Sequence, residues 1–166
     1  PWDVERASDT KYVISYVWST DQKTVYAQEG SISGNVITPN ASTLTLVDAT
    51  GTNGSDSPLL KNIDTNKVAC FYSRLVSGSK ELSFHILDTT STLVSGSRVY
   101  TYNDYAVGTY SLTKLGIDKF AFGYYENNGY TYKVLGVTIS GTTPTIHSGF
   151  NIPGSSGDYV NSFYSC

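Results

Sequence analysis

The fold is decided by residues 64–72, DTNKVACFY, because their pattern occurs three times along the chain. The other two copies are residues 9–16, DTKYVISY, and residues 118–125, DKFAFGYY, so the leading aspartates recur after 55 and then 54 residues. Each copy has an acidic turn, a lysine and an apolar strand that ends in aromatic residues. A repeat at a fixed period predicts an architecture in which neighbouring units stack on one another.

Outside each copy, turn signals and strand signals alternate at short intervals. A second strand is expected in each unit, at residues 24–33, 81–88 and 130–140. A third strand is expected near residues 44–47, 98–102 and 145–152 of the three units. A short fourth strand is expected at residues 59–63, 110–115 and 159–164. Short strands joined by Gly, Asn and Asp turns favour antiparallel hairpins. No segment has a sustained helical period, so the sequence predicts an all-β fold.

The composition excludes several classes of protein. The chain has 166 residues, a net charge of −3, 13% aromatic residues and 15% charged residues. The acidic balance argues against a strong nucleic-acid binder, and the aromatic content argues against disorder. No apolar run approaches the roughly 20 residues of a membrane span. Low charge with many hydroxyl groups is common in secreted and virion-surface β proteins, so we expect an extracellular or virion-surface location.

The repeat predicts one domain over residues 1–166 with three units, 9–63, 64–117 and 118–166, preceded by a lone strand at residues 1–8. An unpaired edge strand must be covered or paired, so we expect self-association or a longer parent chain. The chain is part of a longer protein, or two copies close a six-bladed ring, or the lone strand pairs with a neighbouring subunit in an open filament. A different β architecture, such as a sandwich or a fibre, is the remaining alternative. Trp2 has no repeat equivalent and is the expected interface residue.

The units resemble the degenerate β-propeller repeats of phage and bacterial surface proteins. The resemblance is carried by the opening Asp-x-x-Lys-Val-x-x-x-Tyr and by residues 137–146, VTISGTTPTI. It implies three four-stranded antiparallel propeller-type blades in an incomplete ring. Residues 19–26, STDQKTVY, also resemble the Asp-box hairpin, Ser-x-Asp-x-Gly-x-Thr-Trp, with Lys23 in place of Gly and Tyr26 in place of Trp. Asp-box hairpins are structural, so this resemblance implies no catalytic role.

Residues suited to catalysis or metal binding are few. His85 and His147 are the only histidines, and they fall in different strand regions. No metal-binding spacing is present. We therefore expect no catalytic residue, no metal, no cofactor and no enzymatic activity. Cys70 lies in an apolar run and is expected in the core, and its pairing with Cys166 is left open.

Three arginines keep one enzymatic alternative open. The chain has three arginines, Arg6, Arg74 and Arg98. Sialidases also use three arginines to hold a carboxylate, and this resemblance implies a fragment of a sialidase-like carbohydrate-active enzyme. The three occupy different positions within their repeats. Solvated arginines whose stems cover apolar surface are the simpler interpretation.

Aromatic residues at strand ends are the candidate ligand-binding residues. Trp18, Tyr124 and Tyr125 with Asn127 fit a sugar site, where a ring stacks on the apolar face of a sugar and polar neighbours bind its hydroxyls. The alternative is that Trp18, Tyr72 and Tyr125, at a shared repeat position, form the core between blades. We therefore expect a structural or adhesive module with surface glycans as its ligand, and a structural subunit of an extracellular filament as the alternative.

Overall fold

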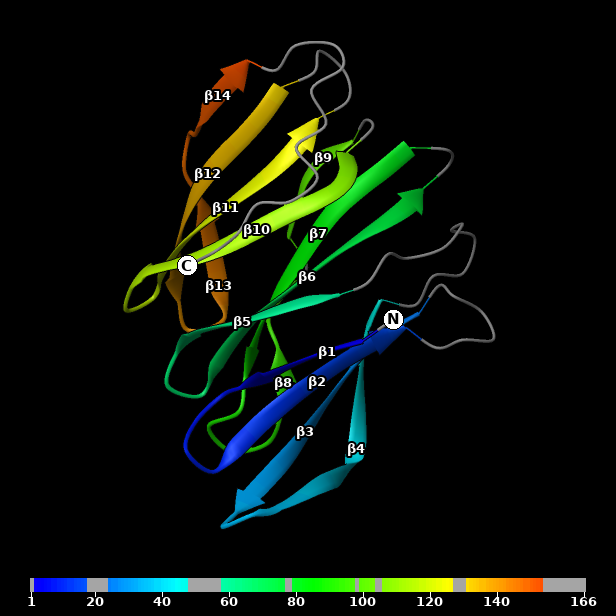
Figure 1. Cartoon of the computed structure of the whole chain (residues 1–166), viewed down its shortest axis with the longest axis vertical. Helices are drawn as coiled ribbons and strands as arrows, with labels where there is room; N and C mark the ends of the chain where they lie inside the picture. The colour runs from blue at the N-terminus through cyan, green and yellow to red at the C-terminus, as the bar shows by residue number, and fades with distance from the viewer. Residues whose placement is uncertain are drawn as a thin grey trace.

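A computed structural model of the chain describes residues 2–17, 24–47, 58–76, 79–97, 99–103, 106–126 and 131–153. These residues form strands joined by turns and loops, and no helix occurs among them. The strands make three antiparallel sheets that follow one another along the molecule without closing into a barrel or ring (Figure 1). The prediction of an all-β fold is confirmed. In this part of the chain there is accordingly no helix that could cross a membrane.

The three sheets have a common plan, in which consecutive strands pair. The first sheet has the order β1 (Trp2–Arg6), β2 (Lys11–Val17), β3 (Val25–Ser33) and β4 (Val36–Val47). The middle sheet consists of β5 (Leu59–Asp64), β6 (Lys67–Val76), β7 (Ser79–Asp88), β8 (Val94–Ser95) and β9 (Val99–Asn103). The last sheet consists of β10 (Ala106–Gly116), β11 (Lys119–Glu126), β12 (Thr131–Ser140), β13 (Thr143–Ile146) and β14 (Phe150–Pro153). The fourth place is shared by β8 and β9, which both pair with β7, and by β13 and β14, which both pair with β12.

The short strand before each repeated lysine belongs to the sheet that follows it. The sequence pattern groups residues 59–63 and 110–115 with the preceding unit, but β5 pairs with β6 and β10 pairs with β11. In the same way β1 pairs with β2, so residues 2–6 complete the first sheet. For β5 the physical reason is the length of its two connections. A two-residue turn joins β5 to β6, whereas a long connection separates β5 from β4.

Two of the three turns before the repeated lysines contain a residue with a left-handed backbone conformation. Asn66 and Asp118 have φ angles of 64° and 52° in the turns that lead into β6 and β11. Asn and Asp tolerate this conformation better than other residues with a side chain, because their short polar groups bond the local backbone. The acidic or amide residue of the repeat therefore makes the hairpin that starts each of these two sheets.

Two hydrophobic cores lie between the three sheets, and β6 contributes to both. Side chains alternate between the faces of a strand. Val68, Cys70 and Tyr72 pack toward the first sheet, and Ala69 and Phe71 pack toward the last sheet. All five are fully buried. The middle sheet is thus covered on both faces.

The core between the middle and last sheets is aromatic. The ring of Phe71 stacks on Phe84 at 4.7 Å between centroids and meets Phe120 and Phe122 at 5.7 Å and 5.2 Å. Such offset and edge contacts add to the free energy gained by burying the rings. The core between the first and middle sheets is smaller in its side chains, and there the Cys70 thiol donates to Ser15 Oγ at 3.4 Å.

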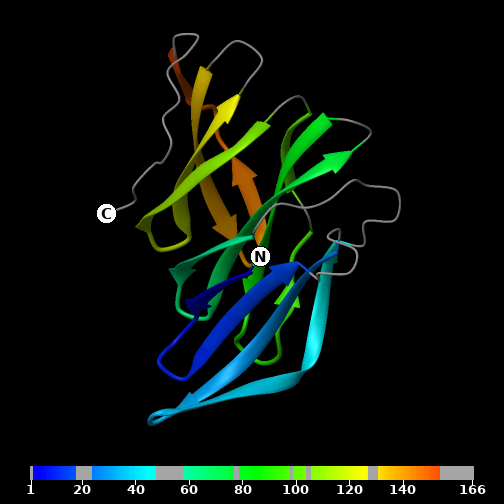
Figure 2. The same ribbon diagram turned by 45° about the vertical axis from the view of Figure 1, so that its right-hand side comes forward.

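The first strands of the sheets lie side by side, with β5 between β1 and β10 (Figures 1 and 2). Asp3 Oδ2 accepts a hydrogen bond of 2.7 Å from the backbone N–H of Leu60. The N–H of Asn66 donates to the carbonyl of Ala7 at 2.9 Å. We call the contact between two adjacent sheets a seam. These polar bonds help to fix the position of the middle sheet relative to the first sheet across their seam.

Candidate functional site

Within the described part of the chain, one face of the first sheet has no other sheet packed on it. In each sheet the first, third and fifth residues after the repeated lysine point toward the preceding sheet. In β6 and β11 these six side chains are buried: Val68, Cys70, Tyr72, Phe120, Phe122 and Tyr124. In β2 the same positions hold Tyr12, Ile14 and Tyr16, which are partly exposed. The first sheet thus presents to the outside the strand positions that the other two sheets bury.

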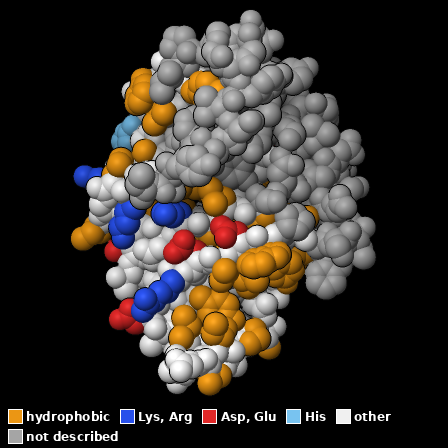
Figure 3. Space-filling view, in the orientation of Figure 1, with side chains coloured by type: hydrophobic (Ala, Val, Ile, Leu, Met, Phe, Trp, Pro, Cys, Tyr) orange, Lys and Arg blue, Asp and Glu red, His pale blue; other side chains and the backbone are white. Residues whose placement is uncertain are grey.

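Strand β1 enlarges this apolar face. Trp2 pairs with Tyr16 and Val4 pairs with Ile14, so all four lie on the same side of the sheet. Trp2 is 67% exposed and Val4 is 48% exposed. We call this surface, formed by Trp2, Val4, Tyr12, Ile14, Tyr16 and Tyr26, the outer face of the first sheet. Figure 3 shows hydrophobic side chains gathered over β1, β2 and β3. A contiguous apolar surface of this kind is typical of a protein–protein contact.

The opposite end of the molecule carries smaller side chains. The second and fourth positions after the repeated lysine point toward the following sheet, as Ala69 and Phe71 do in the middle sheet. In β11 these positions are Ala121 and Gly123, which pair with Gly136 and Val134 of β12. Phe150, whose side chain is exposed, is the backbone partner of Val134 at the edge of the sheet. We call the surface formed by Ala121, Val134, Gly136 and Phe150, on the same side of the sheet as the buried Gly123, the outer face of the last sheet.

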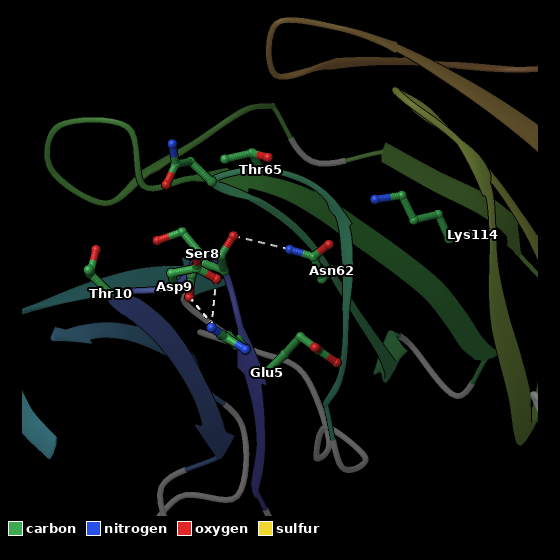
Figure 4. A pocket seen from close by; sticks show the side chains of 10 residues that line it. Glu5, Ser8, Asp9, Thr10, Asn62, Thr65 and Lys114 are labelled. Carbon is green, nitrogen blue, oxygen red and sulfur yellow. Dashed lines mark hydrogen bonds and ion pairs between the residues drawn. The ribbon is translucent and has the colours of Figure 1, made fainter. Parts of the chain in front are cut away.

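A polar cleft of about 700 Å³ opens where the first strands and turns of the three sheets meet (Figure 4). Strand β1 and its turn contribute Glu5, Arg6 and Asp9, β5 contributes Asn62, and β10 contributes Lys114. Figure 4 shows Lys114 on the opposite side of the cleft from Asp9 and Thr10. The Asn62 amide donates to the Ala7 carbonyl at 3.1 Å, so it supports the seam as well as lining the cleft.

The charges in this cleft are partly committed to local contacts. Arg6 Nη2 lies 2.6 Å from Asp9 Oδ1, and its Nε donates to the carbonyl of Ser8 at 3.0 Å. Partial burial raises the pKa of the Glu5 carboxyl, and the nearby Lys61 ammonium offsets part of that rise. The described lining residues include no histidine or cysteine. The cleft offers hydrogen bonds to a polar ligand. Arg6 contributes less to this, because its Nε and Nη2 already bind Ser8 and Asp9 of the adjacent turn.

The two histidines serve the structure of their own sheets. His85 is buried, with Nε2 2.9 Å from Tyr72 Oη and Nδ1 2.8 Å from Ser95 Oγ. His147 is exposed, with Nε2 2.9 Å from Thr138 Oγ1. Within the described residues, no cluster of three or more metal-ligating side chains occurs.

The residues predicted to form a site lie in different parts of the molecule. Tyr124 is only 3% exposed and stacks on Phe122 at 5.9 Å, so it belongs to the core between sheets, and this burial argues against the ligand-stacking role predicted for it. Trp2, the expected interface residue, lies on the outer face of the first sheet. Tyr125 lies in β11, and its side chain is outside the described part. Trp18 and Asn127 lie outside the described residues altogether. So do the side chains of Arg74 and Arg98, Cys166, and most of the Asp-box-like segment.

The sequence reasoning missed the other residues of the outer face of the first sheet. Val4, Tyr12 and Ile14 carry a signal in the repeat itself, because Ile14 aligns with buried Cys70 and Phe122. It also missed Glu29, a carboxylate that is 5% exposed in β3. Its setting depends on an irregularity in β4 that has no mark in the sequence pattern.

No protein-family model matches the chain, and neither a curated protein nor a solved structure gives a significant match to it.

Proposed function

We propose that this chain is a non-enzymatic structural module of the propeller type that associates with further copies of itself, the outer face of the last sheet binding the outer face of the first sheet of the next copy. The observation that carries this proposal is the partial exposure of Tyr12, Ile14 and Tyr16 at strand positions that are buried in β6 and β11. Burying apolar surface is the main source of free energy in protein association.

The proposed contact continues a type of seam that the chain already makes twice. At one seam Cys70 of the middle sheet meets Ser15 of the first sheet, and at the other Phe120 and Phe122 of the last sheet meet Phe71 of the middle sheet. A third seam of the same kind would bring Ile14 of one copy to Gly123 of another. Large side chains on one face then meet small ones on the other, as close packing requires.

The two faces differ, so the contact is head-to-tail. A head-to-tail contact either closes into a ring or grows into an open filament, depending on the rotation between copies. The end of the molecule beside the last sheet also carries Lys119, the exposed equivalent of Lys67 at the seam between the middle and last sheets.

Sedimentation velocity over a concentration series tests the proposal. The unmodified chain should associate, and Val4→Glu should abolish association by placing a charge on the outer face of the first sheet. The matched control is Val36→Glu, because Val36 is 62% exposed at the end of the same sheet and pairs with Ser33, which lies outside the outer face. A chain that stays monomeric at its highest soluble concentration would contradict the proposal.

A second variant blocks the other face. A Cβ atom built at Gly136 meets no neighbouring atom, so Gly136→Lys should fold normally and obstruct only the outer face of the last sheet. Each variant alone should be monomeric. A mixture of Val4→Glu and Gly136→Lys should form dimers that grow no further, because one intact face remains on each partner. Failure of the mixture to dimerise would exclude the head-to-tail arrangement, and circular dichroism checks that both variants are folded.

A further inference from the structure

A second cavity lies in the seam between the first and middle sheets and contains a buried carboxylate. Glu29 Oε1 lies 3.1 Å from Lys11 Nζ and accepts a hydrogen bond of 3.4 Å from Asn40 Nδ2. The other oxygen, Oε2, is buried and has no hydrogen-bond partner among the described residues. Leaving a buried charged acceptor unpaired costs free energy, so such an oxygen indicates a position where a donor is expected.

An irregularity in β4 makes room beside this carboxylate. Gly30 of β3 pairs with Pro39 and Gln28 pairs with Thr43, so residues 40–42 lie opposite Glu29 alone. The extra residues form a bulge, and Figure 2 shows the sharp bend of β4. Bulges bend a strand and are common beside binding sites, where they redirect side chains.

The cavity has about 340 Å³ and two walls from different sheets. Strand β4 supplies the wall that contains Asn40, Ser42 and Leu44, and the turn before β8 supplies Thr92 and Leu93. Lys11 joins the walls, because its ammonium pairs with Glu29 on one side and donates to the carbonyls of Thr89 and Ser91 on the other. This volume is at the lower end of the range for small-molecule sites.

The charges decide which ligand fits. Lys11 already neutralises Glu29, so a cationic ligand would meet an ammonium group nearby, and an anionic ligand would meet the unpaired carboxylate oxygen. What Glu29 Oε2 lacks among the described residues is a hydrogen-bond donor, and a neutral hydroxyl group supplies one without adding charge. Its hydroxyl and amide groups can bond further hydroxyls, and Leu44 and Leu93 supply apolar contact.

We propose that this cavity binds a neutral sugar residue, with one sugar hydroxyl donating to Glu29 Oε2. The site differs from the aromatic platform expected from the sequence, because its polar groups come from a strand bulge and a turn. It lies in a seam within one copy of the chain, so it does not depend on association through the outer faces.

Amide chemical-shift titration with a panel of neutral methyl hexopyranosides tests the proposal, carried out on the monomeric Val4→Glu variant and on the unmodified chain. At least one glycoside should shift the amides of residues 40–44 and 91–93. Glu29→Gln should weaken that binding at least about tenfold, since it replaces a charged acceptor with a neutral amide. A thermal melt checks that this variant is folded.

A matched pair of threonines in one turn separates a binding effect from a folding effect. Thr92 lines the cavity, whereas Thr90 is exposed in the same turn and does not line it. Thr92→Ala should weaken glycoside binding several-fold, and Thr90→Ala should leave it unchanged.

The proposal is overturned if no glycoside of the panel shifts these amides, if Glu29→Gln binds as tightly as the unmodified chain, or if methylammonium binds in preference to every sugar. Absence of association of the unmodified chain, together with glycoside binding, would reject the proposed function and leave this site intact.

Discussion

Lys67 Nζ lies 2.6 Å from Asp118 Oδ1 and thereby ties the middle sheet to the turn between β10 and β11 of the last sheet. The lysine one repeat earlier, Lys11, reaches across the preceding seam to the carbonyls of Thr89 and Ser91. The lysine one repeat later, Lys119, is exposed and makes no ion pair with any described residue. The repeated lysine is thus a seam residue in the first two repeats.

Replacing Lys67 should weaken the seam. Lys67→Met keeps the aliphatic stem and leaves the partly buried Asp118 carboxylate unpaired, so we expect the free energy of unfolding to fall by about 1 kcal/mol. Urea denaturation measures the change. Lys119→Met is the matched control and should change stability by less than about 0.5 kcal/mol. Equal effects of the two variants would show that the ion pair contributes nothing.

Phe71 should be the most sensitive position in the aromatic core. Phe71→Leu removes ring contacts with Phe84, Phe120 and Phe122, and we expect a loss of about 1–2 kcal/mol in the free energy of unfolding. Phe150→Leu, on an exposed ring, should have little effect. Chemical denaturation followed by tyrosine and tryptophan fluorescence compares the two. A Phe150→Leu loss as large as that of Phe71→Leu would contradict the placement of the core.

Two glycines of β12 and its turn should respond oppositely to alanine. Gly141 has a φ of 61°, which an alanine adopts only with strain, so Gly141→Ala should destabilise the chain by about 1 kcal/mol. Gly136 has no positive φ and an added Cβ meets no neighbour, so Gly136→Ala should be neutral or slightly stabilising. Melting temperatures of the two variants give the comparison, and the reverse order would refute this account of the turn.

The Cys70 thiol should be inert in the folded chain. Burial raises the pKa of Cys70 to about 12, so almost no reactive thiolate is present at mildly alkaline pH. Iodoacetamide labelling followed by peptide mapping should find Cys70 unmodified in buffer and fully modified in denaturant. Rapid labelling of Cys70 under native conditions would show that the seam between the first and middle sheets opens readily.

Glu5 should make stability depend on pH. Its pKa is raised in the folded chain, so the folded state binds this proton more tightly than the unfolded state, and the resulting stability is lost as pH rises through the folded pKa. Glu5→Gln should therefore be more stable than the unmodified chain near neutral pH. The difference should shrink as pH falls below the ordinary carboxyl value of 4.5. Urea midpoints at several pH values test this, and a difference that widens toward acid pH would be the opposite result.

The repeat predicts the strands well because its signals are local. A lysine after an acidic turn, followed by apolar residues, is visible in any window that contains it. The partner of a short strand such as residues 59–63 is not local, since it depends on the length of the turns on either side. The local sequence pattern therefore leaves open whether that strand is the last strand of one sheet or the first strand of the next.

The candidate site was harder to predict because faces alternate with every residue. Tyr72 aligns with Tyr125 when the aromatic ends of the strands are matched, but with Tyr124 when the lysines are matched. A shift of one residue moves a side chain to the other face of its sheet. The structure follows the lysines, which places Tyr124 in a core and Tyr16 on the outer face of the first sheet. Glu29 has no repeat signal at all, because its cavity arises from the bulge in β4.

The burial of both faces of β6 has a consequence for how the molecule opens. The first and last sheets each pack against one neighbour, whereas the middle sheet packs against two. In a linear array of units, the ends lose their contacts at lower free energy than the centre. Backbone amides of β6 and β7 should therefore exchange with deuterium most slowly, and those of β4 and β13 most rapidly. The order of exchange would show the order in which the sheets separate from one another.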